Sequence, residues 1–336
     1  MSNKILSCLK KKEKNLPIWF MRQAGRYLPE YQSLRRKNKN FINFCKNPED
    51  IQKATLQPIK RFDVDAAIMF SDILLILDAT GQKISFEEKK GPILNNYNKK
   101  IFYQQSDKDF KKKLKKTYES IKKTRKKLNK EKALIGFAGA PWTLLVYMIN
   151  KQSPKKKLEI EKIKNKEKEK IIKRLEHLIY LHCEEQIKSG ADIIQLFDSW
   201  AGKIKEKEIN KFCIIPNANI IKKIKKKYPH IPVICFPKGI NKKINLFIKK
   251  AKPHAINIDP NMKLKKINIK ANVVFQGGLD PKFLLKGEKQ MFKKAKEYLD
   301  FFKETPYIFN LGHGILPQTK PKTVKRLVEF VRSYKP

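Results

Sequence analysis

Two arginines stand four positions apart near the start of the chain, within the segment PIWFMRQAGRYLPEY at residues 17–31. On a helical turn this spacing would place the guanidinium groups of Arg22 and Arg26 on one face. Gly25 between them would let a ligand come close to the backbone. Guanidinium binds carboxylate through paired hydrogen bonds, so the two arginines suit a substrate that carries several carboxylates. Only nine of the 77 basic residues are arginine, which makes two at this spacing notable candidates for binding.

Three other residues whose side chains could take part in catalysis or binding come just after short apolar runs. Asp72 follows AAIMFS, Ser199 follows DIIQLFD, and His313 follows YIFNLG. No G-x-S-x-G motif surrounds Ser199, so we interpret its hydroxyl as a hydrogen-bond donor to substrate and not as a nucleophile. His313 carries the side chain whose ordinary pKa lies nearest neutrality. It is either a catalytic group or a packed loop histidine that bonds to backbone.

The remaining polar candidates are interpreted as structural. Asp198 and Asp280 lie at strand ends, where a carboxylate commonly binds neighbouring backbone. Tyr147 lies in the apolar run TLLVYMI, and from this pattern alone it belongs to the core. The other histidines show no metal-ligand spacing and are expected to be ordinary surface or core residues: His177, His182, His230 and His254.

Seven short apolar runs predict the elements that position these residues. They lie at 66–70, 133–138, 192–197, 232–236, 255–258, 272–276 and 307–310, and an eighth strand is expected near 84–86. Near-continuous apolar runs are typical of parallel strands covered on both faces. Helical patterns lie between them, at 244–252, 283–302 and 323–334 and in the lysine-rich stretches 107–132 and 155–174.

This alternation fits either a doubly wound sheet or an eight-fold barrel. A dinucleotide-binding sheet should show G-x-G-x-x-G after an early strand, and none follows AAIMF. Polar and glycine residues follow many of the strands, and a barrel gathers all those strand ends on one face. No repeat or Gly/Ser-rich linker divides the chain. We therefore predict a single-domain (β/α)8 TIM barrel over residues 1–336.

The formal net charge of +45 raises the question of a nucleic-acid partner. Base-specific readers lean on arginine for guanine contacts, whereas this chain uses lysine almost throughout, in runs spread over solvated helix faces. We interpret the charge as a compositional bias and expect no nucleic-acid partner. A cationic surface would still attract an acidic small substrate.

The apolar runs are too short for a membrane-spanning helix, which needs about 20 residues. The basic start of the chain offers no apolar stretch of the length that a secretory signal requires. We therefore expect a cytoplasmic protein with no membrane partner. The five cysteines are scattered and never spaced C-x-x-C, so we expect reduced, mostly buried thiols and no zinc ribbon.

Five segments of the chain resemble the uroporphyrinogen decarboxylase family, in the family's order and over nearly the whole length. They are RQAGRYLPEY (22–31), FSDILL (70–75), GFAGAPWTL (136–144), QLFDSWAG (195–202) and FNLGHGILPQT (309–319). The resemblance implies a single (β/α)8 barrel, a homodimer, and an enzyme that uses neither metal nor organic cofactor. The implied reaction removes CO2 from the four acetate arms of uroporphyrinogen III and gives coproporphyrinogen III in tetrapyrrole and heme biosynthesis.

The resemblance also assigns site residues. It places substrate carboxylates against a loop whose residues are Arg22, Gln23, Ala24, Gly25 and Arg26. It places the Asp72 carboxylate under the centre of the macrocycle and makes Tyr147, Ser199 and His313 further substrate contacts. Gly278 stands where the family pattern suggests asparagine, which puts one contact at the rim in doubt.

The chemistry of that assignment can be argued from the substrate. Losing CO2 from an acetate arm leaves an electron pair, and a pyrrole ring protonated at carbon can accept it, as an organic cofactor does elsewhere. Asp72 would accept hydrogen bonds from the pyrrole N–H groups and stabilise the positive charge, and nearby arginines would favour its ionised form. Guanidinium yields protons reluctantly, so the proton donor stays open among Arg22, Arg26, a water and the substrate's own acid groups, with His313 having the more convenient pKa.

Two alternatives belong to other functional classes. A zinc- and corrinoid-dependent methyltransferase of the same barrel superfamily needs a His/Cys/Cys-type zinc site. Around Cys235 the sequence VICFPKG has no histidine two positions before the cysteine. A basic nucleic-acid-binding protein would bind with a steep salt dependence, and it would leave the RQAGR, FSD and GHG motifs unexplained.

Overall fold

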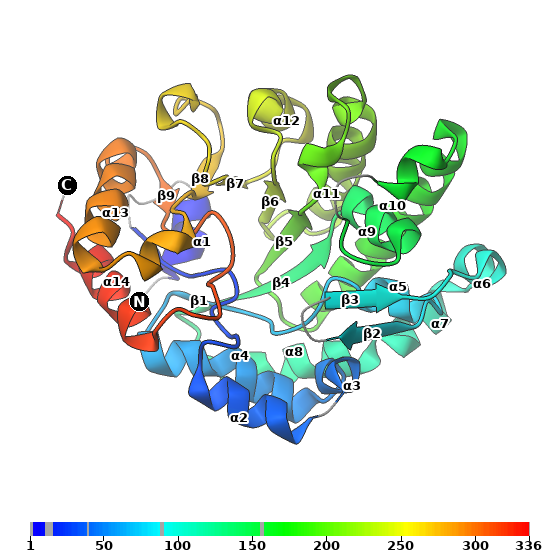
Figure 1. Ribbon diagram of the computed structural model, residues 1–336, viewed down its shortest axis with the longest axis horizontal. Coiled ribbons are helices and arrows are strands. Elements are labelled where there is room, and N and C mark those ends of the chain that lie inside the picture. Colours follow the sequence, from blue (N-terminus) through cyan, green and yellow to red (C-terminus); the bar gives the residue numbers. More distant parts are fainter. Residues whose placement is uncertain (1–2, 11–15, 39, 88–90, 155–157, 336) are drawn as a thin grey trace.

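The structure is a computed structural model that describes residues 3–10, 16–38, 40–87, 91–154 and 158–335. Seven parallel strands form one curled sheet with helices around its outer face (Figure 1). The strands run in the order β1 (Ala66–Ile68), β4 (Ala133–Gly139), β5 (Ile193–Asp198), β6 (Val233–Pro237), β7 (Ala255–Ile258), β8 (Val274–Gly277) and β9 (Tyr307–Ile308). All seven strand predictions are therefore confirmed.

Fourteen α-helices are found in the described ranges, and several begin after a residue whose side chain caps the first turn. The helix over Pro48–Phe62, for example, begins with Asn47, whose side chain accepts the backbone N–H groups of Glu49 and Asp50. The helices are α1 (Lys4–Leu9), α2 (Pro29–Lys37), α3 (Phe41–Cys45), α4 (Pro48–Phe62), α5 (Leu75–Ala79), α6 (Lys99–Gln104), α7 (Asp107–Lys113), α8 (Lys115–Lys127), α9 (Pro141–Asn150), α10 (Asn165–Lys188), α11 (Ile215–Lys227), α12 (Ile244–Ala251), α13 (Glu288–Phe302) and α14 (Pro321–Ser333).

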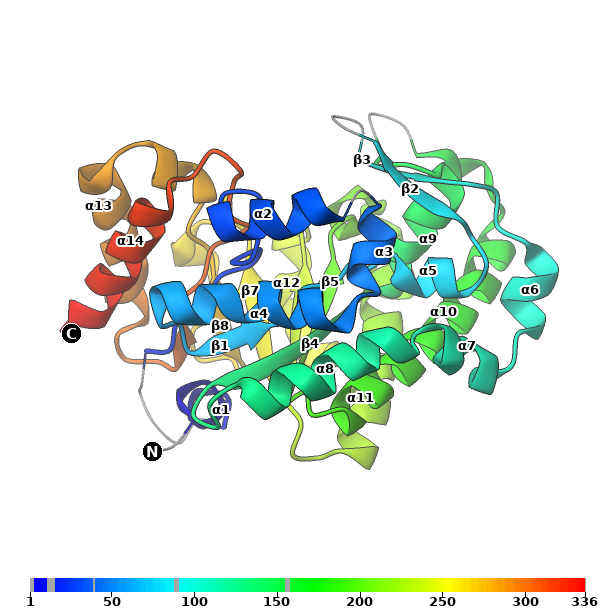
Figure 2. The same ribbon diagram turned by 90° about the horizontal axis from the view of Figure 1, so that it is seen from below.

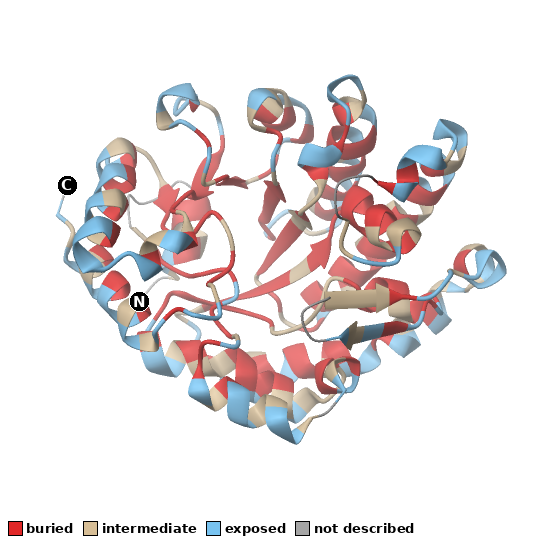
Figure 3. Cartoon of the chain, in the orientation of Figure 1, coloured by how far each residue is buried: buried red, intermediate tan, exposed pale blue. Residues whose placement is uncertain are grey.

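The lysine-rich stretches are helical where the structure describes them. The stretch 107–132 forms α7 and α8, and most of 155–174 belongs to a short 3-10 turn and to the first part of α10, while 155–157 lies outside the described residues. Apolar residues of α7 and α8 face inward and lysines face solvent, as the blue outer faces in Figure 3 show. None of the described helices is both long and apolar enough to cross a bilayer.

The core has two sides because strand residues alternate between them. On one side lies a cluster that includes Ile68, Ile135, Ile234 and Val274 from four strands, together with Ile5 from α1. On the other side the strands pack against the apolar faces of the surrounding helices. The strand interiors are accordingly buried in Figure 3.

The eighth strand is not where the sequence predicts it. The expected strand near 84–86 exists as β2 (Ile84–Glu87), but β2 pairs antiparallel with β3 (Gly91–Leu94) in a separate two-stranded sheet. Figure 2 shows this pair beside α3 and α5, away from the parallel strands. Its side chains alternate between buried and exposed, whereas a strand between two covered neighbours needs apolar residues on both faces.

A short extended segment instead lies between β9 and β1, which do not pair with each other. The Trp19 N–H donates to Phe309 O over 3.3 Å and the Phe309 N–H to Pro17 O over 2.9 Å. On the other side, the Asp65 N–H donates to Ile18 O over 2.8 Å. The structure thus shows a curled sheet of seven strands joined through residues 17–19, and not eight paired strands.

Candidate active site

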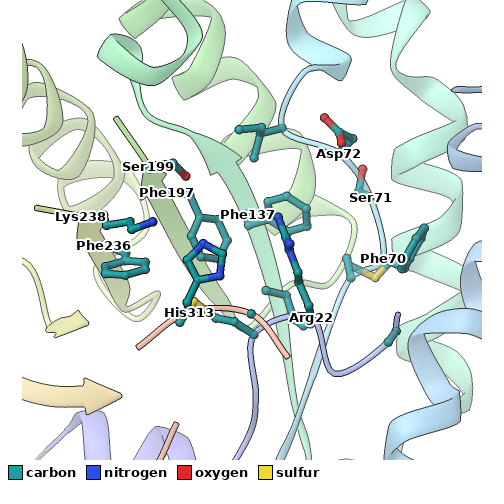
Figure 4. A pocket seen from close by; sticks show the side chains of 16 residues that line it. Arg22, Phe70, Ser71, Asp72, Phe137, Phe197, Ser199, Phe236, Lys238 and His313 are labelled. Atoms are coloured by element: carbon teal, nitrogen blue, oxygen red, sulfur yellow. The ribbon is translucent and has the colours of Figure 1, made fainter. Parts of the chain in front are cut away.

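A cavity of about 220 Å³ opens at the carboxyl ends of the strands. Sixteen residues line it, from the ends of β1, β4, β5 and β6 and from the loops around residues 22 and 313 (Figure 4). They are Met21, Arg22, Ala24, Ile68, Met69, Phe70, Ser71, Asp72, Ile73, Phe137, Phe197, Ser199, Phe236, Lys238, His313 and Gly314. This is the face where a barrel-like sheet places its chemistry.

Aromatic rings make the inner wall of the cavity. Phe137 on β4 and Phe197 on β5 meet edge to face, with ring centroids 5.6 Å apart and planes at 76°. Phe236 on β6 extends this wall, as Figure 4 shows. An apolar wall with a few polar groups around it is the usual design of a site for an organic molecule.

Asp72 is the one carboxylate among the residues that line the cavity. It follows β1, and the segment before it is fixed by the Phe70 N–H, which donates to Thr55 Oγ1 on α4 over 2.9 Å. The Asp72 Oδ1 accepts the Leu74 N–H over 2.8 Å. This tight turn holds the carboxylate at the cavity wall, where Figure 4 shows it beside Ser71.

The environment of Asp72, taken as a whole, disfavours the ionised form of its carboxyl group. Burial raises the pKa of this carboxyl above its ordinary value, while the Leu74 N–H and the Arg22 charge lower it by smaller amounts. As expected, the Arg22 charge favours the ionised form of Asp72, although its effect and that of the Leu74 N–H are smaller than the effect of burial. Burial outweighs them because it removes the water that stabilises the charged form. A carboxylate held in this way interacts strongly with any positive charge that arrives beside it.

The arginine loop is not helical, which corrects the helical-turn prediction. Residues 21–27 form turns and bends, and Arg22 adopts the left-handed conformation with φ of 56°, a rare one for a residue with a side chain. Both arginines are exposed, but the reversal directs Arg22 toward the cavity, whereas Arg26 is absent from its lining. The two guanidinium groups therefore do not share the face that a helical turn would give them.

The loop after β9 fastens Arg22 beside His313. The Met21 N–H donates to Asn310 Oδ1 over 3.0 Å, and the Ile315 N–H donates to Met21 O over 3.0 Å. These two bonds join the arginine loop to the LGHG motif from both sides. Arg22 and His313 therefore lie as neighbours at the cavity (Figure 4).

His313 is half-buried, and its surroundings disfavour the protonated ring. Burial, with the charges of Lys238 and Arg22, lowers the pKa of His313 from 6.5 to about 4. The expectation that this histidine has the convenient pKa for an acid is therefore wrong. A neutral imidazole at physiological pH can accept or donate a hydrogen bond, but it carries no proton for release.

Ser199 lines the cavity at the end of β5, next to a buried polar cluster. Asp198, 1% exposed, accepts the Thr143 hydroxyl over 2.7 Å and the Asn217 amide over 3.4 Å. Thr143 Oγ1 in turn accepts the Trp200 N–H over 3.1 Å. Asp198 thus has the structural role expected of it, although its partners are side chains more than backbone, and it fixes the backbone on both sides of Ser199.

Other sequence candidates lie elsewhere. Ala24 lines the cavity, but Gln23, Gly25 and Tyr147 do not. Gln23 is fully buried: its Nε2 donates to Ala66 O over 2.9 Å and its Oε1 accepts the Phe20 N–H over 3.1 Å, so it fastens the loop to β1. Tyr147 is half-buried on α9, and its ring meets that of Trp200 edge to face at 6.1 Å.

Sequence reasoning missed Lys238. It comes directly after β6, the strand VICFP, at the same kind of position as the other site residues, and it lines the cavity. Lysine is so common in this chain that the residue type alone does not mark Lys238 as a site residue. Its place at a strand end is the signal that could have found it.

The histidines and cysteines away from the cavity have structural roles in the part of the chain that the structure describes. His177 contacts Asp107, His182 contacts the Tyr118 hydroxyl, and His254 accepts the Val233 N–H. All five cysteines are buried and unpaired. Within the described ranges, no three His, Cys, Asp or Glu residues are grouped so that they could hold a metal ion.

Gly278, the departure from the family pattern, is required by its backbone and its neighbour. Its φ is 110°, and a Cβ there would lie 2.3 Å from Tyr298 Cε1. The Tyr298 hydroxyl donates to Gly278 O over 2.8 Å. A side chain at this position would displace Tyr298, so this loop conformation requires glycine at position 278. Asp280 follows on the same loop, and its carboxylate accepts the Lys282 N–H. This contact with neighbouring backbone is the structural role that the sequence predicts for Asp280.

Comparison with known proteins agrees with the motifs. The family model for uroporphyrinogen decarboxylase matches residues 2–334. A protein of Rickettsia bellii named uroporphyrinogen decarboxylase is 43% identical, and the match covers 98% of each chain. A protein of the same name from Orientia tsutsugamushi is 40% identical over 99% of this chain and 98% of its own.

Among solved structures, a methyltransferase from Methanosarcina mazei superposes with a TM-score of 0.78 over 98% of this chain and 97% of its own, at 17% identity. A putative vitamin-B12-independent methionine synthase from Listeria monocytogenes gives 0.55 over 96% and 98%, at 10% identity. At these identities the likeness concerns the fold alone. The fold is therefore shared with enzymes of other activities, and the site must decide the chemistry.

Proposed function

The chain belongs to the uroporphyrinogen decarboxylase family, and we propose that the cavity around Asp72 is the place where it decarboxylates its substrate. The activity itself follows from the family: the chain is a carboxy-lyase that converts uroporphyrinogen to coproporphyrinogen in porphyrin and heme biosynthesis. The observation that carries the assignment of the site is that Asp72 lies in the cavity wall within electrostatic reach of Arg22.

The reaction needs a temporary store for electrons, and the pyrrole supplies it. A proton added to a ring carbon makes the ring cationic. Cleavage of the bond between the acetate methylene and its carboxyl carbon then returns an electron pair to the ring and releases CO2. A second proton on the methylene carbon and loss of the first from the ring leave a methyl group, so one proton replaces one CO2. This is the role of an electron-sink cofactor, taken by the substrate.

Asp72 stabilises the cationic ring in this proposal. Its carboxylate faces the cavity, where it can accept the inward pyrrole N–H groups and oppose the positive charge that develops. Because the site is half-buried, this interaction is stronger than it would be in water. The aromatic wall of Phe137, Phe197 and Phe236 excludes water from the same space.

The other residues orient the carboxylate arms. Arg22 is placed to bind an arm by a two-pronged contact, and Ser199 and His313 offer further hydrogen bonds in the cavity. A neutral His313 serves as a hydrogen-bonding group and not as the acid, because its pKa of about 4 leaves it unprotonated. Arg22, Arg26, a water and a substrate carboxyl remain the candidates for the donor of the first proton.

Arg26, Gln23, Gly25 and Tyr147 stay predictions from the family resemblance. Arg26 is exposed on the same loop as Arg22, where it can meet arms of a macrocycle that projects beyond the cavity. Gln23 and Gly25 act through the shape of that loop. Tyr147 contacts Trp200, which follows Ser199, and it is proposed to act at the rim.

The architecture is proposed as one domain over residues 1–336, a (β/α)8 barrel in which residues 17–19 take the eighth strand position. The hydrogen bonds of this segment to Phe309 and Asp65 support that proposal. A homodimer and a cytoplasmic location are proposed from the family resemblance. Sedimentation equilibrium of the purified chain and fractionation of its host cells test these two points.

The rival functions are less favoured. A zinc-dependent methyltransferase would need ligands near Cys235, which is 1% exposed and lies in no metal-type group within the described ranges. A nucleic-acid-binding role would leave the cavity and its acid without purpose. Anaerobic incubation of the purified chain with uroporphyrinogen, followed by analysis of the products, tests the proposal: coproporphyrinogen supports it, and unchanged uroporphyrinogen contradicts it.

A further inference from the structure

Lys238 stands across the cavity from Asp72. It comes directly after β6, is half-buried, and lies beside Phe236 and Ser199, while Asp72 and Ser71 form the far side (Figure 4). Arg22 and His313 lie between these two sides in the same view. The cavity therefore has one cation close to its acid and a second cation on the opposite wall.

The backbone of Lys238 is held at both of its polar groups. Its N–H donates to Asp198 O over 3.1 Å, and its carbonyl accepts the Gly202 N–H over 2.8 Å. A Cβ on Gly202 would lie 2.8 Å from Gly239 Cα, so the loops after β5 and β6 touch backbone to backbone. A residue anchored in this way presents its side chain from a fixed origin, as binding groups require.

The Lys238 ammonium group makes no ion pair with any carboxylate in the part of the chain that the structure describes. The Lys238 charge lowers the pKa of Asp259, against the larger effect of burial. Asp259 is itself engaged, since its Oδ2 accepts the Gly239 N–H over 2.6 Å. The cation is thus left to face the cavity.

The position of this cation relative to Arg22 matters for an anionic ligand. Both charges lower the pKa of His313, so both lie within electrostatic reach of that ring from its two sides. A molecule in the cavity would meet a positive group at each side of His313 and a negative group only at Asp72. This pattern fits a ring with acid arms on its edge and N–H groups at its centre.

We propose that the Lys238 ammonium group binds a propionate carboxylate of the bound macrocycle, on the side away from the arm that reacts. The inference rests on the proposed function of the cavity. The four acetates become methyl groups in turn, whereas the four propionates remain in substrate and product. A cation that holds a propionate keeps its partner through every round, and it can orient the ring each time another acetate is presented to Asp72.

The test uses Lys238→Gln and Lys238→Arg with two ligands. In Lys238→Gln we expect the KM for uroporphyrinogen to rise about tenfold, the effect of losing one charge-assisted hydrogen bond, with kcat within about twofold of the parent value. The Ki of coproporphyrinogen as a product inhibitor should rise by the same factor, because it carries propionates and no acetate. Lys238→Arg should recover most of both losses.

Lys126→Gln is the matched control, since it removes one exposed lysine charge on α8, outside the cavity. It should leave KM and Ki unchanged, which separates local binding from the overall charge of the protein. If Lys238→Gln unfolds at a lower temperature than the parent chain, Lys238→Met, which keeps the length of the side chain, replaces it.

Three results would overturn the proposal: an unchanged KM, a loss confined to kcat, or a KM that rises while the Ki of coproporphyrinogen does not. The last would place an acetate at Lys238. None of them touches the proposed function, which fails only if the parent chain makes no coproporphyrinogen.

Discussion

The side chain of Arg22 lies directly against the backbone of Gly314. A Cβ added to Gly314 would lie 2.3 Å from Arg22 Cδ and 2.6 Å from its Cγ, far closer than atoms pack. The glycine of the LGHG motif thus leaves the space through which the arginine reaches the cavity. Its φ is not in the left-handed region, so the requirement comes from the neighbour and not from the backbone.

Gly314→Ala is therefore expected to displace Arg22 and lower kcat/KM by about tenfold or more, the size of effect that a small misplacement in a site can have. A double-mutant cycle with Arg22→Ala measures the coupling. If Gly314 acts only through Arg22, the double variant is no worse than Arg22→Ala alone. Fully additive losses would contradict this.

Lysine is expected to be a poor substitute for Arg22 despite the same charge, because an ammonium group cannot make the two-pronged contact. Arg22→Lys should raise the KM for uroporphyrinogen by about tenfold. Arg26→Lys should raise the KM less, since Arg26 lies outside the cavity lining that includes Arg22. Steady-state kinetics of the two variants side by side checks this, and equal KM values for both variants and the parent would refute the argument from fork geometry.

The stability of the protein is expected to fall as the pH is lowered from 7 to 5. Burial lowers the pKa of His182 to about 4, from 6.5, so in this interval the unfolded chain binds a proton that the folded chain refuses. For His182 alone this removes about 2 kcal/mol of unfolding free energy at pH 5. Urea unfolding at both pH values measures it.

The control for this prediction is His182→Gln, which cannot take up the proton. In this variant the difference in unfolding free energy between pH 7 and pH 5 should be smaller by about 2 kcal/mol, whatever the substitution itself does to stability. The same difference in parent and variant would show that His182 does not contribute.

Activity is expected to survive exhaustive chelation and dialysis. The electron sink in the account is the substrate's own pyrrole ring, so no step needs a metal ion or an organic cofactor. Turnover of uroporphyrinogen is measured before and after treatment. A loss of activity that a divalent metal restores would contradict the proposed chemistry and revive a metal-dependent mechanism.

The strands could be predicted from the sequence because each is a continuous apolar run, as burial on both faces demands. The segment 17–19 could not, since it is too short and makes its bonds to Phe309 and Asp65 through the backbone, which leaves little trace in side-chain pattern. Residues 84–86 look more like a strand than residues 17–19 do, because they alternate in the way a strand does. One of their faces is half-exposed, however, and they pair in a separate two-stranded sheet.

The site shows the same division. Asp72, Ser199 and His313 could be predicted because they follow strands and belong to recognisable motifs. The left-handed conformation of Arg22 could not, because it depends on the packing of its loop against Asn310 and Gly314 and not on the residue type. The direction of the pKa shifts at Asp72 and His313 depends on burial, which a sequence does not give.

Whether the Asp72 carboxylate carries the reaction is decided by the turnover of Asp72→Asn under anaerobic conditions. Asparagine keeps the size of the side chain and can still accept the Leu74 N–H, so the fold and the binding of uroporphyrinogen should persist. Asp300→Asn, an exposed change on α13, is the control. Coproporphyrinogen formation should fall by about a hundredfold or more in Asp72→Asn and stay unchanged in Asp300→Asn. Near-normal turnover by folded Asp72→Asn would contradict this role of Asp72.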